Sequence, residues 1–170
     1  MNRTRRRYSH FAEINWNIWQ PEQIATLVFV ISGERVLLIH KKRGLGAGKI
    51  NGPGGRIDPG ESPLECAVRE VQEELRVTPI GLAQSGELLF QFTDGLSIHV
   101  TVFMASGCIG EPQETEEAKP LWAPLDKIPY EQMWADDRLW IPLMLEGKNF
   151  EGRFLFDEDR MVEYRLKSVP

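Results

Sequence analysis

Four glutamates and one arginine in this chain have the types and spacing needed to hold a metal ion. In chain order they are Glu61, Arg69, Glu70, Glu73 and Glu74. Residues three and four apart share one face of a helix, so Glu70, Glu73 and Glu74 are expected to lie side by side. Three like charges repel one another unless a cation lies among them. The pattern therefore indicates a hard divalent ion with oxygen ligands, Mg2+ or Mn2+.

The helix that must position these glutamates is predicted over Pro63–Leu75. Ser62 fits the N-cap of a capping box, with a proline at the first helical position and Glu65 at the third. A glycine-rich loop, residues 51–55, precedes it and lets main-chain groups approach a metal or phosphate closely. An exposed acidic helix after an ordinary turn is the alternative interpretation. The stripe expected to face the core contains Leu64, Ala67, Val68, Val71 and Leu75.

Length and composition limit the class of protein. A chain of 170 residues with 42% apolar residues can form one domain with a sizeable core. The formal net charge of -5 argues against a partner that is a nucleic acid polymer. No apolar run approaches the length that spans a membrane. Cys66 and Cys108 are too few for a disulfide framework, so we expect a cytoplasmic location and interpret Cys66 as a structural thiol.

Strand and helix patterns alternate along the chain, which predicts an α+β protein. The segments 25–31 and 36–40 are expected to pair around a turn, and Asp94-Gly95 predicts a hairpin between 82–93 and 96–106. A short strand is expected near 121–123 and a second helix over 136–145. Segments 150–156 and 161–166 are expected to form a closing hairpin. Strands interleaved with two helices indicate a mixed sheet sandwiched between helices, an α/β/α arrangement.

The first 23 residues differ in composition from the rest. Residues 3–7 are basic and lack the apolar core of a secretion signal. Four aromatic residues follow, too many for a plain linker: Tyr8, Phe11, Trp16 and Trp19. We therefore expect residues 1–23 to form an extension that packs on the domain or on a partner subunit, and residues 24–170 to form a single domain. A monomer is expected, with a dimer through the extension as the alternative.

The segment from Gly55 to Val77 resembles the signature of the Nudix family, hydrolases that cleave a nucleoside diphosphate linked to another moiety. The family pattern places a glycine, a single glutamate, an Arg-Glu pair and a Glu-Glu pair at the spacing seen here, and it ends with a glycine followed by an apolar residue. Arg76 stands where the family has that last glycine, which typically closes the helix in a left-handed conformation. The resemblance implies the Nudix fold and a divalent metal.

Two further segments resemble the animal-type oxidised-purine nucleoside triphosphatases, the 8-oxo-dGTP diphosphatases. They are residues 41–52 and residues 133–137 with Trp140 and Pro142 behind them. By this resemblance, Asn51, Asp136 and Asp137 meet the base, and Lys41 contacts phosphate. Leu45 and Pro53 replace aromatic residues of the family. The remaining positions that the resemblance assigns to the pocket and metal are Thr26, Phe90, Phe92, Trp134 and Glu117.

The chemistry of these residues suits an altered purine. Asn51 offers both a donor and an acceptor to a purine edge. Two adjacent carboxylates facing one cavity disfavour double ionisation, so one tends to keep a proton and donate it. Trp134 supplies a face for stacking. Taken alone, however, Asp136 or Asp137 could be a helix N-cap, and Phe90 and Phe92 could be one face of a sheet.

The resemblance implies Mg2+-dependent hydrolysis of oxidised purine nucleoside triphosphates to a nucleoside monophosphate and pyrophosphate. Gly54 through its carbonyl, with Glu70, Glu73, Glu74 and Glu117, would hold the ion. Glu73 or Glu74 would take a proton from water, and Arg69 would orient Glu61 or a helix glutamate. Two alternatives are a Nudix pyrophosphohydrolase of another nucleotide, such as ADP-ribose, a dinucleoside polyphosphate or an ordinary dNTP, and a non-catalytic nucleotide sensor.

Overall fold

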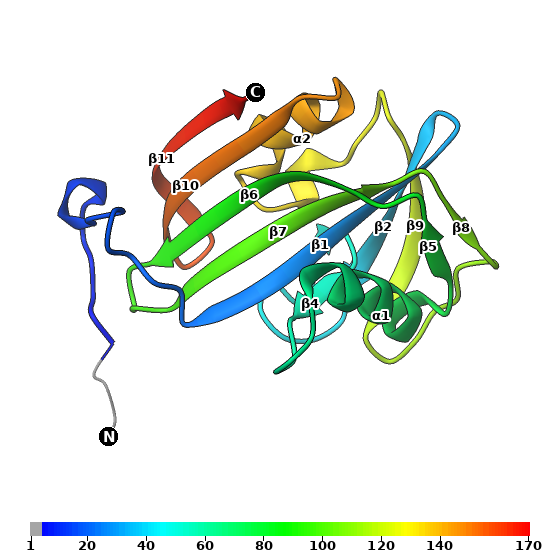
Figure 1. The fold of residues 1–170 in the computed structure, drawn as a ribbon, viewed down its shortest axis with the longest axis horizontal. Coiled ribbons are helices and arrows are strands. Elements are labelled where there is room, and N and C mark those ends of the chain that lie inside the picture. Colours follow the sequence, from blue (N-terminus) through cyan, green and yellow to red (C-terminus); the bar gives the residue numbers. More distant parts are fainter. Residues whose placement is uncertain (1–4) are drawn as a thin grey trace.

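The computed structural model describes residues 5–170, which form a curved mixed sheet with a helix on each face (Figure 1). The sheet has nine strands, with β11-β10-β6-β7-β1-β2-β3 in line and with β4 and β9 beside β1 and β2. The helices are α1 (Pro63–Leu75) and α2 (Asp137–Leu145), with short 3-10 turns η1 (Phe11–Glu13) and η2 (Tyr130–Gln132). The strands are β1 (Gln23–Ser32), β2 (Arg35–Lys41), β3 (Ile50–Asn51), β4 (Gly54–Arg56), β5 (Thr78–Ile80), β6 (Ala83–Phe92), β7 (Ser97–Ala105), β8 (Gly107–Ile109), β9 (Ala118–Pro124), β10 (Asn149–Asp157) and β11 (Arg160–Val169).

Alternating side chains on the central strands supply a separate core on each face of the sheet. On β1, Val28 and Val30 pack in the cluster that contains α1, whereas Phe29 packs in the cluster that contains α2. On β2, Leu37 packs in the cluster that contains α1, and Leu38 packs in the cluster that contains α2. Such continuous apolar runs are typical of strands buried on both faces. The predicted sandwich of helix, sheet and helix is confirmed.

Antiparallel hairpins join neighbours in sequence, and two parallel pairings join the hairpins together. The predicted pairs β1–β2, β6–β7 and β10–β11 are all present. Parallel contacts of β1 with β7 and of β10 with β6 complete the sheet. The sequence did not predict these long-range contacts, nor the separate two-stranded sheet of β5 and β8.

Helix α1 begins and ends at the predicted residues. The Ser62 hydroxyl accepts a hydrogen bond from Glu65 N at 3.1 Å, and the Glu65 carboxylate accepts from Ser62 N at 3.2 Å. Arg76 closes the helix with φ 62° and ψ 27°, the left-handed conformation that the family glycine would adopt at less cost. Leu64 was expected in the core but is 49% exposed, because the first turn of α1 extends beyond the edge of the apolar cluster.

The aromatic part of the N-terminal extension packs on its own domain. Phe11, Trp16 and Trp19 form a run of contacting rings with centroids 5.5 and 5.4 Å apart. Arg153 of β10 and Arg165 of β11 lie against the Trp16 and Phe11 rings. The prediction of packing on the domain is confirmed. The first four residues, including Arg3, lie outside the described part of the chain.

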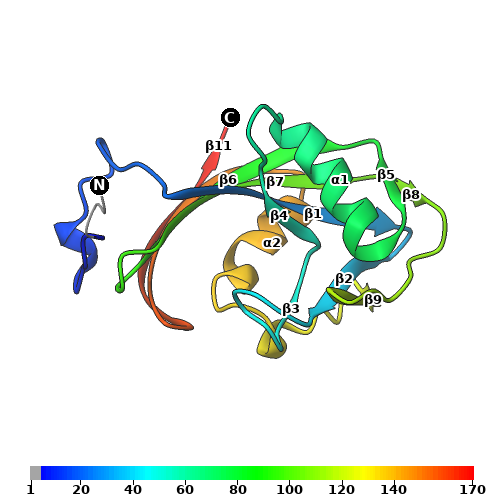
Figure 2. The same cartoon turned by 90° about the horizontal axis from the view of Figure 1, so that it is seen from below.

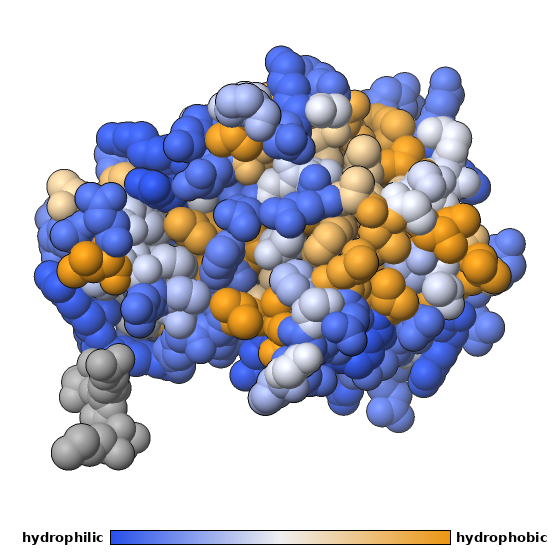
Figure 3. All heavy atoms as spheres, viewed as in Figure 1, coloured by the Kyte–Doolittle hydropathy of each residue, from blue (hydrophilic) through white to orange (hydrophobic). Residues whose placement is uncertain are grey.

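The face shown in Figure 3 is hydrophilic near the extension and more hydrophobic at the opposite end, over β5 and β8. Ile80 on β5 and Ile109 on β8 are 44% and 66% exposed. Within residues 5–170, no helix is long and apolar enough to cross a membrane.

Candidate active site

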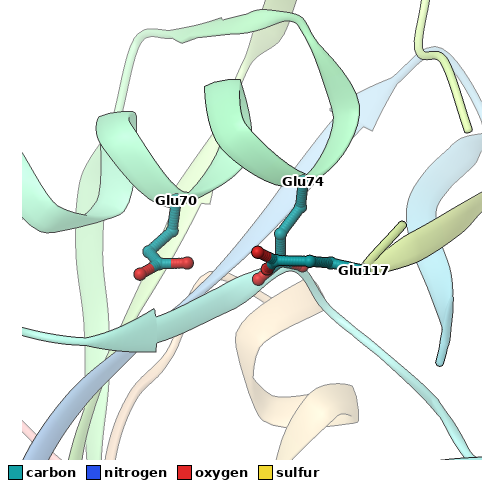
Figure 4. A group of neighbouring side chains, drawn as sticks. All are labelled: Glu70, Glu74 and Glu117. Atoms are coloured by element: carbon teal, nitrogen blue, oxygen red, sulfur yellow. The ribbon is translucent and has the colours of Figure 1, made fainter. Parts of the chain in front are cut away.

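Three carboxylates from two segments converge beside the sheet. Glu70 and Glu74 extend from α1, and Glu117 comes from the residue just before β9 (Figure 4). One oxygen of each lies within 4.8 Å of one oxygen of the others. The β2–β9 pairing places Glu117 here, and the Thr115 hydroxyl fixes its loop by donating to Glu74 O at 2.7 Å. Three carboxylate oxygens at this spacing suit a hard divalent cation.

The cluster is electrostatically incomplete without a cation. Burial, together with the nearby Glu70 charge, raises the pKa of Glu74 to about 8, and burial also raises the pKa of Glu70. Glu74 Oε2 is buried without a hydrogen-bond partner among the described residues, while Oε1 accepts from Gly54 N at 3.4 Å. A buried, unpaired carboxylate oxygen costs free energy that a cation would offset. The donor set therefore fits the predicted metal.

Arg69 holds the helix face together by contacting several acidic groups at once. It donates to both oxygens of Glu61 at 2.7 and 2.8 Å, a bidentate pair. The same guanidinium donates to Glu70 Oε1 at 2.8 Å. The Arg69 hydrogen bonds lower the pKa of Glu61 to about 2. Ion pairing of Arg69 with Glu61 or a helix glutamate was expected, and the structure has both pairs; that they orient these carboxylates for catalysis stays a prediction.

Glu73 differs from the other helix glutamates. Its side chain is 51% exposed, and its carboxylate accepts from Arg69 Nη1 at 3.2 Å. Glu73 shares the Arg69 guanidinium with Glu70 and so lies on the same side of the helix, but its oxygens are not among those that converge from Glu70, Glu74 and Glu117. At about 100° per residue, positions three and four beyond Glu70 fall on opposite sides of it, so only Glu74 turns toward the sheet.

Two glycines let the loop approach the acidic cluster. A Cβ on Gly55 would lie 2.5 Å from the Glu70 carboxylate, and a Cβ on Gly54 would lie 2.0 Å from the carbonyl oxygen of Thr26. Both glycines pair with β1, opposite Thr26 and Leu27. Only residues without a side chain fit between this strand and α1. The Gly54 carbonyl remains a predicted ligand.

A pocket adjoins the cluster and contains every substrate-binding residue predicted from the sequence. Its space, counted with the open mouth, is about 800 Å3. Gly54 and Glu74 line the pocket where it meets the acidic cluster. The predicted substrate-binding residues are all among the other lining residues: Thr26, Lys41, Asn51, Phe90, Phe92, Trp134, Asp136 and Asp137. The pocket and the three carboxylates thus form one continuous site.

Aromatic rings form one wall of this pocket. Trp134 meets Phe92 and Phe156 edge-on, at centroid distances of 6.2 and 5.5 Å. Phe90 lies 6.0 Å from Phe156. The alternative that Phe90 and Phe92 only cover one face of a sheet is therefore incomplete, because both rings also line the pocket.

Asp136 and Asp137 are buried at the pocket, with 2% and 3% of their surfaces exposed. Asp136 Oδ2 accepts from Trp140 Nε1 at 2.8 Å. One oxygen of each aspartate, Asp136 Oδ1 and Asp137 Oδ2, is buried without a partner among the described residues. Burial raises the pKa of Asp136 to about 6 and that of Asp137 well above its usual range. Asp136 stands at the N-cap but its side chain caps nothing, so the N-cap interpretation is excluded.

Three further lining residues differ in the groups that they can offer to a ligand: Thr26, Asn51 and Lys41. The Thr26 hydroxyl lies 3.3 Å from Cys66 Sγ, on the α1 side of β1, which leaves mainly its backbone to the pocket. Asn51 Oδ1 accepts from Gly52 N at 2.8 Å, so its amide nitrogen is the group left to donate. Burial lowers the pKa of Lys41, opposed by the charges of Glu74, Glu70 and Glu117.

Sequence reasoning missed several pocket residues. Ile98, Val100 and Phe156 line the pocket, and their alternation on neighbouring strands was the available signal. Lys49 does not line the pocket but lies beside one of its walls: its Nζ is 5.3 Å from the Trp134 ring centre and 3.4 Å from Asp159 Oδ2. No sequence signal marks Lys49, because its partners come from distant loops.

Comparison with known proteins agrees with this geometry. The model of the NUDIX domain matches residues 21–144. The oxidized purine nucleoside triphosphate hydrolase of Danio rerio is 46% identical over 151 residues, covering 86% of this chain and 96% of the relative. The protein of the same name from Mus musculus is 41% identical over 149 residues, covering 86% and 96%. A MutT protein from Bacillus halodurans superposes with a TM-score of 0.77 at 28% identity, over 85% of this chain and 97% of that one.

Both the family model and the relatives span most of the chain, and the residues that match the family signature form one site. The chain therefore belongs to the Nudix hydrolase family.

Proposed function

We propose that this protein hydrolyses oxidised purine nucleoside triphosphates, of the 8-oxo-dGTP or 2-hydroxy-dATP type, to the nucleoside monophosphate and pyrophosphate. The observation that carries this proposal is the single pocket that joins the Asp136–Asp137 pair and Asn51 to Glu74 of the acidic cluster. A base bound at the aspartates would place its phosphates toward the glutamates. The names of the Danio rerio and Mus musculus relatives support the same substrate class.

The residues of the chain divide the chemistry between them. Glu70, Glu74 and Glu117, with the Gly54 carbonyl, would hold Mg2+, and Mn2+ is a similar hard ion. When bound, such an ion neutralises phosphate charge and acidifies water. Lys41 lines the pocket beside Glu74, where its ammonium group would contact phosphate.

Hydrolysis needs a proton acceptor for the attacking water. Water adds to one of the two phosphorus atoms joined by the α–β bridging oxygen, the bond from that phosphorus to the bridging oxygen breaks to separate the monophosphate from pyrophosphate, and a glutamate receives the proton of the water. Glu74 lies in the pocket wall, whereas Glu73 is half-exposed and paired with Arg69. Of the two predicted bases, the geometry favours Glu74. Arg69 would keep Glu70 and Glu61 in place.

A cytoplasmic location is part of the proposal. It is supported by the two cysteines, Cys66 and Cys108, because both are free thiols and a reducing compartment keeps thiols free. The extension packs on its own chain, which favours the proposed monomer.

A pyrophosphate-release assay with a panel of nucleotides tests the proposal. The panel contains 8-oxo-dGTP, 2-hydroxy-dATP, dGTP, dATP and ADP-ribose, each with Mg2+ and with EDTA. We expect Mg2+-dependent release, with kcat/KM roughly ten- to a hundred-fold higher for the oxidised purines, the range for a hydrogen-bonded edge in a dry pocket. Equal rates on damaged and normal purines would indicate another Nudix pyrophosphohydrolase. Nucleotide binding without hydrolysis would indicate a sensor.

A further inference from the structure

The N-terminal segment, defined here as residues 8–22, contacts the strand turn that carries part of the aromatic wall. It lies on the convex side of β6, β10 and β11, opposite α2 (Figure 2). The family model begins at residue 21, so almost the whole segment precedes the part of the chain that matches the NUDIX domain. Any role of the segment must therefore be read from its own contacts.

The segment reaches the sheet through a hydrogen bond between Trp19 and Gln91. Trp19 Nε1 donates to Gln91 Oε1 at 2.8 Å. Gln91 is only 3% exposed, and its Nε2 donates to the main-chain oxygens of Phe92 at 2.9 Å and Leu96 at 3.3 Å. Because both ends of this buried amide are paired, its orientation is fixed. Trp19 supplies the one hydrogen bond that its carbonyl oxygen accepts from a described side chain.

The Gln91 amide adds to the backbone hydrogen bonds that hold Phe92, whose N–H donates to Leu96 O at 2.8 Å and whose carbonyl oxygen accepts from Gly95 N at 3.0 Å. Side chains alternate along a strand, so Gln91 faces the N-terminal segment while the Phe92 ring lines the pocket on the other face. That ring meets Trp134 and Phe156 at centroid distances of 6.2 and 5.8 Å. The Phe92 ring in the pocket is thus linked, through the main chain, to the Gln91 side chain on the opposite face of the sheet.

Further contacts hold the segment on both sides of Trp19. After it, Glu22 N donates to Ser97 O at 3.1 Å and to Ser97 Oγ at 2.9 Å. Before it, the Trp16 ring lies 5.8 Å from the Arg153 guanidinium. These contacts restrict the Trp19 indole to one place, so its N–H is positioned before a nucleotide binds.

We propose that Trp19 and Gln91 are positioning residues for the base pocket, through which the N-terminal segment sets the affinity for the nucleotide. This inference rests on the proposed function for the identity of the ligand. The mechanism is indirect, because neither side chain lines the pocket: Trp19 holds Gln91, Gln91 adds to the hydrogen bonds that hold the main chain of Phe92, and Phe92 forms the wall.

The test compares Trp19→Phe with Trp16→Phe. Both changes keep an aromatic ring and delete one indole N–H, but Trp16 Nε1 has no hydrogen-bond partner among the described residues. In Trp19→Phe we expect the KM for 8-oxo-dGTP and the Kd for 8-oxo-dGMP to rise about threefold to tenfold, the range for networks that couple through packed side chains. The kcat should stay unchanged, and Trp16→Phe, which keeps a ring beside Arg153 and removes an N–H that has no partner among the described residues, should raise KM and Kd clearly less than Trp19→Phe.

A second variant helps to separate the proposed loss of affinity from a folding defect. Gln91→Met removes all three bonds of the amide and should raise KM at least as much as Trp19→Phe. The double variant should show no further rise, because both changes break one chain of contacts. All assays are run well below each melting temperature. A wild-type KM in Trp19→Phe, an equal change in Trp16→Phe, or additive effects would overturn the inference.

The two proposals fail in distinguishable ways. If wild type does not prefer 8-oxo-dGTP over dGTP, the proposed function fails. The Trp19→Phe and Trp16→Phe comparison then still tests the positioning role with whichever nucleotide of the panel the protein does bind.

Discussion

Two groups of acidic side chains lie at opposite ends of the same pocket, and their surroundings differ. Glu70, Glu74 and Glu117 gather their oxygens around a common point with no described donor for Glu74 Oε2. Asp136 and Asp137 are more deeply buried, and Trp140 donates to one of them. Burial raises pKa values in both groups. The first arrangement suits a cation, whereas the second suits a shared proton.

Repulsion between neighbouring carboxylates can be relieved in two ways, by a cation or by a proton, and each way gives a different function. A cation among the glutamates would activate phosphate chemistry. A proton on the aspartate pair turns one acceptor into a donor, which lets the pair read an altered purine edge. The predictions below separate these two functions.

The largest effect is expected for Glu74→Gln. The change removes a metal-ligand charge and the favoured proton acceptor, so kcat should fall by about 10²–10⁴, as is typical for a lost acid–base group. In metal-free buffer at pH 7–8, the variant should melt at a higher temperature than wild type, because wild type must take up a proton on Glu74 or bury its charge when it folds, and glutamine does neither. A steady-state assay and a thermal melt measure the two effects. Wild-type activity that persists in EDTA would contradict the metal mechanism.

Asp137→Asn should alter base preference and leave Mg2+ dependence intact. If the pair shares a proton, wild type should change its preference between oxidised guanine and oxidised adenine as pH rises through about 6, the pKa of Asp136. Asparagine fixes one donor and should flatten that dependence. It should also cost roughly ten- to a hundred-fold in preference for the oxidised edge. The measurement is kcat/KM for both nucleotides from mildly acidic to mildly alkaline pH, and a constant ratio in wild type rules the switch out.

Stability should fall as pH rises in metal-free buffer. The folded-state pKa is about 8 for Glu74 against an ordinary 4.5, and about 6 for Asp136 against 3.8. The folded state then holds more protons than the unfolded state between about pH 4 and 8, so raising the pH favours unfolding. Saturating Mg2+ should remove the Glu74 contribution and leave that of the aspartates. Melting temperatures across this range, with and without Mg2+, test both halves; a flat profile without metal argues against the raised pKa values.

The smallest effect is expected for Arg76→Gly. Glycine adopts the left-handed conformation of Arg76 without strain, so the variant should gain about 0.5–1 kcal/mol, or about 1–4 °C in melting temperature. Because Arg76 is exposed and outside both acidic groups, kcat and base preference should not change. The variant is therefore the stability control for Glu74→Gln, and a loss of activity would show that helix closure matters to catalysis.

The parts of the site that sequence reasoning could predict are those that are local in the chain. Helix α1, its cap and two of its glutamates follow from spacing within one helix. The exposure of Glu73 does not, because it depends on which side of Glu70 turns toward the sheet, and that is set by packing of the whole helix. The base pocket combines residues from β1, β6, β10 and α2, and only a family resemblance could assign most of them. The Trp19–Gln91 contact spans 72 positions and leaves no periodic signal.

We propose that the two acidic groups act separately at one pocket. Calorimetric binding of 8-oxo-dGMP and dGMP to wild type and to the Glu74→Gln variant tests this, because both ligands are monophosphates, which the site can bind but which have no triphosphate to hydrolyse. We expect the ratio of the affinities for 8-oxo-dGMP and dGMP to be the same in the variant as in wild type. A ratio that falls to one would contradict it, and would show that base recognition depends on the same charges as hydrolysis.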